Sequence, residues 1–358
     1  MGIFLSRPIG ILAIFLSVFS GSALTVNIKD ASSPEYVIQS RNQILYVVNS
    51  GNNTISICQR NQYDGSILDN CIISSANDLL SQPQEIVLNK ERTRAYISNL
   101  GAVKDLAPGS VTMCPVDRNG MFIEENCVVM SGNGSFEQPM GLSLGNCDNF
   151  LYVANGLDST PSSVSSCPIR PDGTFADCAR QYHCGPLGSN GLNVDPLGKF
   201  IYITNYYSNF DHSSPNEGPG AITICPLDGC GTIEIERCVQ SEAGNSVNGP
   251  FAIKISPLFT FAIIASKGQA DISSSISVCP VDQFTGLLSS ECTSILNENN
   301  LSNPHSLAFD PIGRFVYITD TDNNSVTVCS AGKFGSISSC RSYVGNGFNQ
   351  PTGIFIYE

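Results

Sequence analysis

A short apolar run with a tyrosine at its second position recurs along the chain at intervals of about 50 to 60 residues. Its copies are LYVVN (45–49), AYISN (95–99), LYVAN (151–155), IYITN (201–205) and VYITD (316–320), with a degenerate copy, FAIIA, at 261–265. In the degenerate copy we take Ala262 as the counterpart of the tyrosine. A repeat of this length indicates an assembly of equal units, because a single small unit cannot bury both of its faces alone.

The unit itself is clearest at 303–340, where four apolar runs are separated by turn residues. The runs are HSLAF, RFVYIT, SVTVC and ISSC, and the breaks between them are Asp310 to Gly313, DTDNN and the turn around Gly335. Short runs with period-2 alternation, bounded by Gly, Pro, Asn and Asp, predict an antiparallel meander of four strands. We predict an all-β fold, a β-propeller of six such blades, with seven blades as the alternative. The repeats are about 34–80, 81–137, 138–185, 186–248, 249–302 and 303–349.

Two segments compete to form the innermost strand of the first blade. One is 35–39, and the other is 352–357 in the C-terminal stretch QPTGIFIYE. The C-terminal copy matches the opening of the other repeats better, since it has the Pro-x-Gly-apolar pattern of 139–142. We predict that residues 350–358 close the ring, because a propeller that does not join its ends leaves exposed strand edges.

The N-terminus has a different character. Arg7 precedes an apolar run of about a dozen residues, followed by small residues up to Ala23. This is the pattern of a secretory signal peptide, and the run is too short to span a bilayer. We predict a signal peptide over 1–23, a single propeller domain over 24–358, no membrane span after cleavage, and a secreted or periplasmic protein. The formal net charge of −13 argues against binding nucleic acid or anionic lipid through a basic surface.

Twelve of the 15 cysteines form one pair in each repeat, separated by 11 or 13 residues and straddling a turn that contains glycine. Residues equidistant from a hairpin turn face each other across the ladder, within disulfide range. An oxidising compartment then favours six disulfides, and the predicted bridges are Cys58–Cys71, Cys114–Cys127, Cys167–Cys178, Cys225–Cys238, Cys279–Cys292 and Cys329–Cys340. The partners of Cys147, Cys184 and Cys230 stay open. With three His and no Cys-x-x-Cys, we expect no metal site and no cofactor.

Each repeat opens with Pro or Asn-Gly, and the residue after this opening is expected at one mouth of the central channel. These mouth residues are Gln84, Met140, Leu192, Phe251, His305 and Thr352. A hydrolase needs a base with an orienting partner and a group that stabilises developing charge. Apart from His305, the set offers no titratable side chain.

Two insertions follow the second strand of their repeats, at 101–109 and 206–220. Long loops on a rigid scaffold often carry function. Insertions at equivalent turns lie on one face of a propeller, so we predict a binding surface there. Its candidate residues are Lys104, Asp105, Tyr206, Tyr207, Phe210 and Asp211.

The strands LYVAN, IYITN and VYITD resemble the YVTN-type propeller repeat, a relative of NHL and lactonase-type propellers. Residues 304–320, PHSLAFDPIGRFVYITD, are similar to a repeat of the 6-phosphogluconolactonase-like family. The resemblance covers 34–358 and implies the propeller fold, which hosts many functions. In the lactonase-type group it implies polar and charged residues at one channel mouth, where only His305 matches by position.

We therefore predict a binding or protein-interaction module rather than an enzyme, whose protein or small-molecule ligand the sequence does not name. A lactonase-like hydrolase with its site near His305 is the alternative. A structural surface protein hardened by disulfides is the third interpretation.

Overall fold

The computed structural model describes residues 43–103, 109–145, 147–156, 163–175, 177–182, 188–206, 220–241, 247–268, 273–296 and 301–357. They lie within one compact unit, Asn42–Glu358. The predicted signal peptide, the segment 35–39 and Cys184 lie outside the described residues. In the described part of the chain, no helix is long and apolar enough to cross a membrane.

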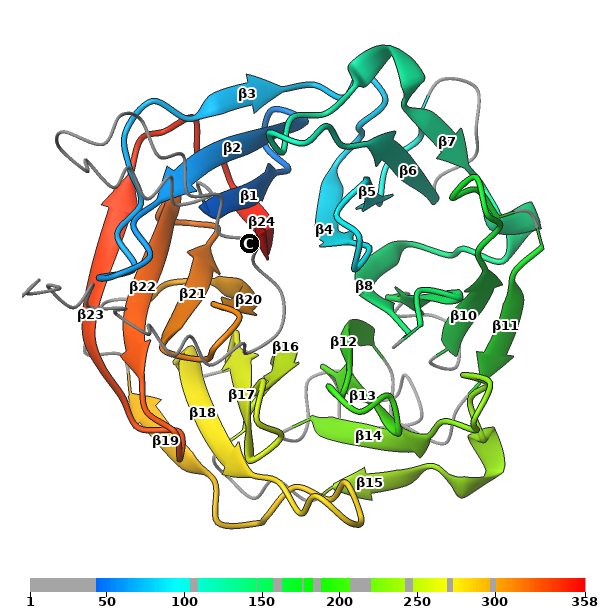
Figure 1. The fold of residues 1–358 in the computed structure, drawn as a ribbon. Coiled ribbons are helices and arrows are strands. Elements are labelled where there is room, and N and C mark those ends of the chain that lie inside the picture. The colour runs from blue at the N-terminus through cyan, green and yellow to red at the C-terminus, as the bar shows by residue number, and fades with distance from the viewer. Residues whose placement is uncertain are drawn as a thin grey trace, which may run out of the picture. The chain divides into compact units, whose positions relative to one another are not determined.

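The unit consists of six four-stranded antiparallel sheets arranged as the blades of a propeller (Figure 1). The first blade has, from the centre outward, β24 (Pro351–Tyr357), β1 (Gln43–Asn49), β2 (Thr54–Arg60) and β3 (Ile72–Ser74). The second blade has β4 (Pro83–Leu88), β5 (Arg94–Asn99), β6 (Ser110–Pro115) and β7 (Val128–Met130). The third has β8 (Pro139–Leu144), β9 (Phe150–Asn155), β10 (Ser163–Pro168) and β11 (Ala179–Tyr182). The fourth has β12 (Ser189–Val194), β13 (Phe200–Asn205), β14 (Ala221–Pro226) and β15 (Val239–Ser241). The fifth and sixth have β16 (Pro250–Ile255), β17 (Phe261–Ser266), β18 (Ser275–Pro280) and β19 (Thr293–Leu296); and β20 (Pro304–Phe309), β21 (Phe315–Asp320), β22 (Ser325–Ala331) and β23 (Ile337–Val344). The only helices among the described residues are three single 3-10 turns, η1 (Glu124–Asn126), η2 (Gly132–Gly134) and η3 (Ile235–Arg237).

The C-terminal strand closes the ring, as predicted. β24 pairs with β1, although the two strands are about 300 residues apart in the chain. It also contacts β20 on one side and β4 on the other, so the six innermost strands form a closed cycle. Ile354 and Ile356 of β24 are buried in the core between the first and sixth blades.

The recurring tyrosines tie neighbouring blades together. Each hydroxyl donates a hydrogen bond to the carbonyl of the hairpin glycine in the next blade: Tyr46 to Gly120, Tyr96 to Gly173, Tyr152 to Gly231, Tyr202 to Gly286 and Tyr317 to Gly65. Burial raises the pKa of Tyr96 to about 12, so the phenol remains a donor at ordinary pH.

The fifth blade corrects one assignment. Ala262 pairs with Cys279 in the same way that Ala95 pairs with Cys114. The counterpart of the tyrosines is therefore Ile263, one residue later. Ile263 has no hydroxyl, so this blade interface lacks the repeated tyrosine bond. The degenerate motif was read one residue out of register because it carries no tyrosine to mark the position.

All six predicted disulfides are present, one between the third and fourth strands of each blade. Cys147 and Cys230 are exposed free thiols. Disulfides persist in oxidising compartments, which is consistent with an extracellular or periplasmic protein.

Candidate functional site

The predicted mouth residues lie where the innermost strands begin, with one exception. β12 begins at Ser189, which pairs with Asn205 as Pro83 pairs with Asn99. The mouth residue of the fourth blade is therefore Asn190. Leu192 is a core residue that pairs with Ile203, equivalent to Ile86 in β4. The prediction misplaced it because Asn190-Gly191, and not Ser189, was taken as the counterpart of the opening prolines.

This mouth is closed by its own side chains. Gln84, Met140, Asn190, Phe251 and His305 surround a void of only about 10 Å³. The His305 ring packs edge-on against Phe251, with ring centroids 4.4 Å apart. Burial is the main cause that holds the pKa of His305 well below its usual range, and the nearby Lys267 ammonium adds to it. The imidazole is therefore neutral. His305 is a packed residue with no substrate space beside it among the described residues.

Tyr206, a candidate of the predicted binding surface, lies against Phe251 of the predicted channel mouth. Its ring packs edge-on against Phe251 at 6.3 Å, and its hydroxyl donates to the Gly268 carbonyl at 3.1 Å. Lys267 lies against the same ring, with Nζ 3.3 Å from the Phe251 centroid, and burial lowers the pKa of this lysine to about 7. The other candidates of the predicted binding surface, Lys104, Asp105, Tyr207, Phe210 and Asp211, lie outside the described residues.

Below the mouth the channel narrows, because neighbouring innermost strands touch backbone to backbone. A Cβ on Gly141 would lie 2.6 Å from the Asn190 carbonyl oxygen, and one on Gly353 would lie 2.7 Å from the Gln84 carbonyl oxygen. Gly191 has the same contact with the Phe251 carbonyl oxygen. Glycine is required at these positions because no side chain fits between the strands.

Glu85 occupies this level of the channel, and the sequence analysis missed it. Its repeat equivalents are small residues: Gly141, Gly191, Ala252, Ser306 and Gly353. An alignment of the repeats would have singled out Glu85, because it is the one carboxylate at a position where the other repeats have small side chains. It was overlooked because only the first residue after each opening was considered.

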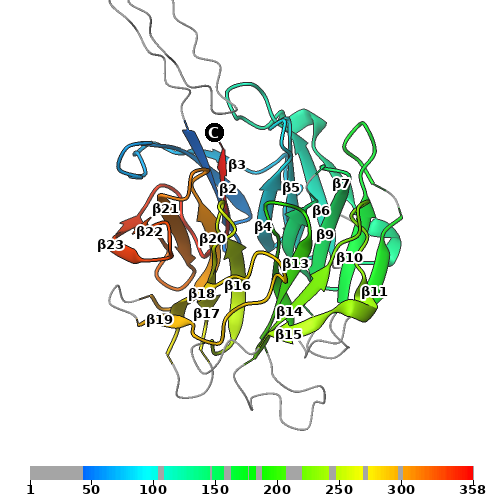
Figure 2. The ribbon, with the colours of Figure 1, turned by 60° about the horizontal axis from the view of Figure 1, so that its bottom comes forward.

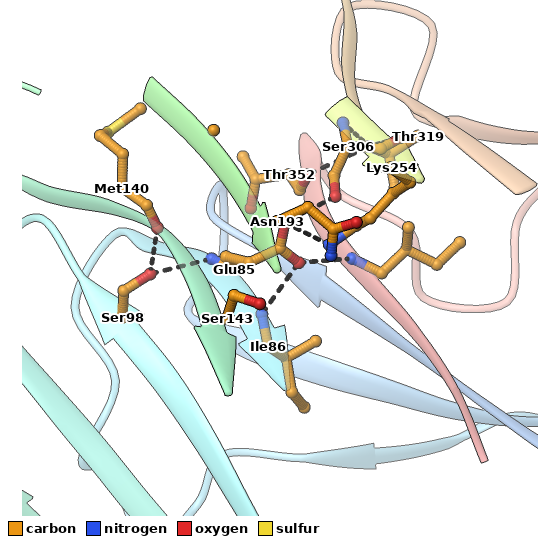
Figure 3. Close-up of polar contacts among 12 residues, drawn as sticks. Glu85, Ile86, Ser98, Met140, Ser143, Asn193, Lys254, Ser306, Thr319 and Thr352 are labelled. Carbon is orange, nitrogen blue, oxygen red and sulfur yellow. Dashed lines mark hydrogen bonds and ion pairs between the residues drawn. The ribbon is translucent and has the colours of Figure 1, made fainter. Parts of the chain in front are cut away.

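The Glu85 carboxyl contacts groups of its own blade and of three other blades (Figure 3). One oxygen accepts hydrogen bonds from the backbone N–H of Ile86 at 3.1 Å and of Ile354 at 3.4 Å. The other accepts from the Ser306 hydroxyl at 2.8 Å and lies 3.9 Å from Lys254 Nζ. Burial raises the pKa of Glu85, and the Lys254 charge and these hydrogen bonds partly oppose that rise.

Lys254 stands in the next layer of the channel, together with Asn193 and Ser143. The carbonyl oxygen of the Asn193 side chain accepts from the Ile255 N–H at 2.9 Å, and the Ser143 hydroxyl accepts from the Val194 N–H at 3.1 Å. These bonds hold both side chains in place and leave the Asn193 amide group and the Ser143 hydroxyl proton available as donors. Repeat equivalents of this layer in the other blades are apolar: Val87, Ala308 and Phe355.

The polar layer meets a cavity of about 350 Å³ inside the channel. Every innermost strand contributes to its lining. The polar lining residues are Lys90, Ser143, Asp148, Asn193, Asp195 and Lys254, and most of the others are apolar. The apolar lining comprises Val87, Leu88, Leu142, Leu144, Val194, Pro196, Ala308, Phe309, Ile354, Phe355 and Ile356. Lys90 and Asp148 lie at the cavity boundary, where the Lys90 N–H donates to the Asp148 carboxylate. The size is that of pockets that take small organic ligands.

Among the described residues, no group of three or more His, Cys, Asp or Glu is placed to hold a metal ion. The charged and polar groups that line the cavity are the ammonium groups of Lys254 and Lys90, the carboxylates of Asp148 and Asp195, the Asn193 amide and the Ser143 hydroxyl, with the Glu85 carboxyl behind Lys254.

Comparison with known proteins identifies the architecture. A periplasmic gluconolactonase of Pseudomonas aeruginosa, PpgL, superposes with a TM-score of 0.60 at 16% sequence identity, over 88% of this chain and 99% of the other. A putative 6-phosphogluconolactonase of Bacteroides fragilis gives 0.59 at 14% identity, over 88% and 98%. A chain of a nidogen/laminin complex gives 0.59 at 11% identity, over 88% and 98%.

The fold is that of the lactonase-type propellers. This agrees with the resemblance seen in the sequence, although at these identities the likeness shows the fold alone. No protein-family model matches the chain, so the YVTN or NHL repeat name stays a prediction. The sequence also has no significant match among curated proteins. The structural neighbours include a protein named as a gluconolactonase and a chain of a nidogen/laminin complex, so the function must be argued from the channel.

Proposed function

We propose that the protein is an extracytoplasmic binding protein that holds a small amphipathic carboxylate in its central channel. The observation that carries this proposal is Lys254, whose ammonium meets one end of an otherwise largely apolar cavity of about 350 Å³. Its nearest anion, Glu85, is 3.9 Å away, beyond ordinary hydrogen-bond distance. The ammonium therefore keeps donors for a ligand.

The composition of the lining selects the ligand class. A carboxylate accepts charge-assisted hydrogen bonds from Lys254 and the Asn193 amide, and an aliphatic tail is stabilised by the surrounding Leu, Val, Ile and Phe side chains. A bare sugar acid fits less well, because most of the lining residues are apolar and give its hydroxyls few partners. Burial raises the pKa of Glu85, which weakens the competition of this carboxyl for the Lys254 charge.

Calorimetric titration with sodium octanoate at pH 7 tests this proposal. We expect saturable binding of one octanoate per chain, weakened about 10- to 100-fold in Lys254→Met, because a hydrogen bond to a charged group contributes about 1.5–3 kcal/mol. Ala308→Leu fills the cavity without changing charge and is expected to weaken binding as well. Lys199→Met removes an exposed lysine outside the channel and serves as the matched control.

Octanol and gluconate measure separately what the aliphatic tail and the carboxylate charge contribute to binding. Octanol has the tail without the charge, and gluconate has the charge without the tail, so each is expected to bind more weakly than octanoate. No octanoate binding, or equal binding to wild type and to both channel variants, would contradict the proposal.

Lactone hydrolysis in the same channel is the second candidate function. It is favoured by Glu85, a buried carboxyl beside a lysine, and by the neighbours named as gluconolactonases. Against it, each Glu85 oxygen already accepts hydrogen bonds from the protein, and Glu85 lines only the void of about 10 Å³ at the mouth and not the larger cavity.

We expect no hydrolysis of glucono-1,5-lactone above the uncatalysed rate, measured by acid release in a weakly buffered solution. Turnover that disappears in Glu85→Gln would instead make the channel an active site. Turnover that disappears in His305→Ala, with Glu85→Gln active, would place the reaction at the closed mouth, as in the alternative drawn from the sequence.

A further inference from the structure

Exposed apolar side chains collect on the turns of three consecutive blades. Phe284, Phe334 and Tyr63, at the hairpin tips of the fifth, sixth and first blades, are 93%, 90% and 79% exposed. Leu258 and Ile312, in the turns after the innermost strands of the fifth and sixth blades, are also exposed. We call these five residues the apolar strip. The turns that carry them join first to second and third to fourth strands, so they lie on one face of the propeller (Figure 2).

Hydrogen bonds connect these turns into one continuous band. The Gln283 amide, beside Phe284, donates to the Leu258 carbonyl, and the Thr260 hydroxyl in the same turn donates to the Lys333 carbonyl, beside Phe334. Within the sixth blade the Ala331 N–H donates to the Arg314 carbonyl, and the Arg314 guanidinium donates to the Gln62 carbonyl, beside Tyr63. These bonds place the five turns of the strip side by side.

The other blades provide an internal comparison. One or two residues before the hairpin glycine, where the strip has Tyr63, Phe284 and Phe334, the second to fourth blades have Arg118, Asn119, Pro171, Asp172, Gly229 and Cys230. In the turn that carries Leu258 and Ile312, the second blade has Lys90-Glu91 and the third has Cys147-Asp148, whereas the fourth has the exposed Leu197. The fold therefore does not require aromatic residues at the hairpin tips. Three neighbouring hairpins nevertheless have aromatic residues there, which indicates an interaction surface.

The charges of the strip are balanced, unlike those of the whole chain. The exposed charged residues in its five turns are Asp64, Asp282, Arg314 and Lys333, two acidic and two basic. Asp310 in the same region is buried near Arg60. The chain as a whole carries a formal charge of −13. A locally neutral surface complements an uncharged or zwitterionic partner and gains nothing from a strongly charged one.

We propose that the apolar strip docks on a zwitterionic lipid bilayer. Phe284 and Phe334, each about nine-tenths exposed, make almost no contact with their own protein, so a protein partner would have to supply a shaped pocket for each ring. A fluid bilayer accepts projecting aromatic and aliphatic tips in any arrangement, and aromatic rings are favoured at its interface. The docking is peripheral, and it goes beyond ligand binding in the channel.

Co-flotation of the disulfide-bonded protein with phosphatidylcholine vesicles tests the proposal. We expect the wild-type protein to float with the vesicles, and 1 M NaCl to leave the bound fraction unchanged, because apolar contacts are not screened by salt. The triple variant Y63S/F284S/F334S is expected to bind at least about tenfold more weakly. The matched control R118S/N119S/D172S changes the equivalent tips of the second and third blades and is expected to float as the wild type does.

The remaining outcomes overturn the proposal. These are wild-type protein that stays unbound, binding that requires phosphatidylglycerol or is released by salt, and equal loss in both triple variants. Concentration-dependent self-association of the wild type without flotation, measured by light scattering, would assign the strip to a second copy of the chain. Octanoate titration of the strip variant, which is expected to match the wild type, shows that it is folded and keeps this test separate from that of the channel.

Discussion

Deletion of Pro351–Glu358 is expected to leave a chain that does not fold into a stable propeller. The deletion removes the innermost strand of the first blade and exposes one edge of β1. It also removes buried Ile354 and Ile356, and the loss of a single large buried side chain costs about 2–5 kcal/mol. Since a domain is stable by only about 5–15 kcal/mol, these losses together consume most of the margin.

Further bonds across the ring disappear with the same strand. The Thr352 hydroxyl donates to the Pro83 carbonyl at 2.9 Å, and the Thr319 hydroxyl donates to the Thr352 carbonyl at 3.0 Å. Solubility and thermal unfolding of the truncated chain measure the effect, and addition of a synthetic 351–358 peptide is the control, since it is expected to restore part of the stability. A truncated chain that melts at the temperature of the full chain would show that another segment, such as 35–39, closes the ring.

Gly141→Ala is expected to destabilise the propeller by about 1–3 kcal/mol, the usual cost of overpacking. The added Cβ would lie 2.6 Å from the Asn190 carbonyl oxygen and 2.9 Å from the Gly191 Cα. Both contacts are with backbone, so the clash is relieved only if β8 and β12 move apart. That movement would disturb the narrow part of the channel where Glu85 is held.

Gly229→Ala is the matched control for this substitution. A Cβ on Gly229 meets nothing within 4 Å, and surface changes of this kind usually alter stability by no more than about 0.5 kcal/mol. Chemical denaturation of both variants, with the disulfides intact, measures the difference. Equal stability of Gly141→Ala and Gly229→Ala would mean that the innermost strands are not in the close contact described.

The sequence predicted the architecture well because the fold repeats. Each tyrosine, hairpin glycine and cysteine pair occurs in five or six copies, so one noisy copy is corrected by the others. The errors fall where the pattern is degenerate. Ala262 was chosen over Ile263 in the one repeat without a tyrosine, and Leu192 was chosen over Asn190 in the one repeat that opens with serine.

The candidate site was harder to predict because it depends on departures from the repeat. Glu85, Lys254 and Asn193 lie on three different strands, more than 50 residues apart, at positions where other blades have small or apolar residues. A repeat alignment reveals such exceptions. It does not show that Glu85, two residues after the opening proline of its strand, meets Lys254, four residues after the opening proline of another. The register shift within each of these innermost strands sets that geometry. Nor does the sequence show that the mouth of His305 is closed while the cavity lies beyond Lys254.

A crystal structure of the protein with octanoate tests the central claim most directly. The account predicts a carboxylate within hydrogen-bond distance of Lys254 Nζ, with the aliphatic chain along Leu142, Val194 and Ile354 in the channel. An empty channel at a saturating octanoate concentration, or octanoate bound at the opposite mouth against His305 and Phe251, would contradict it.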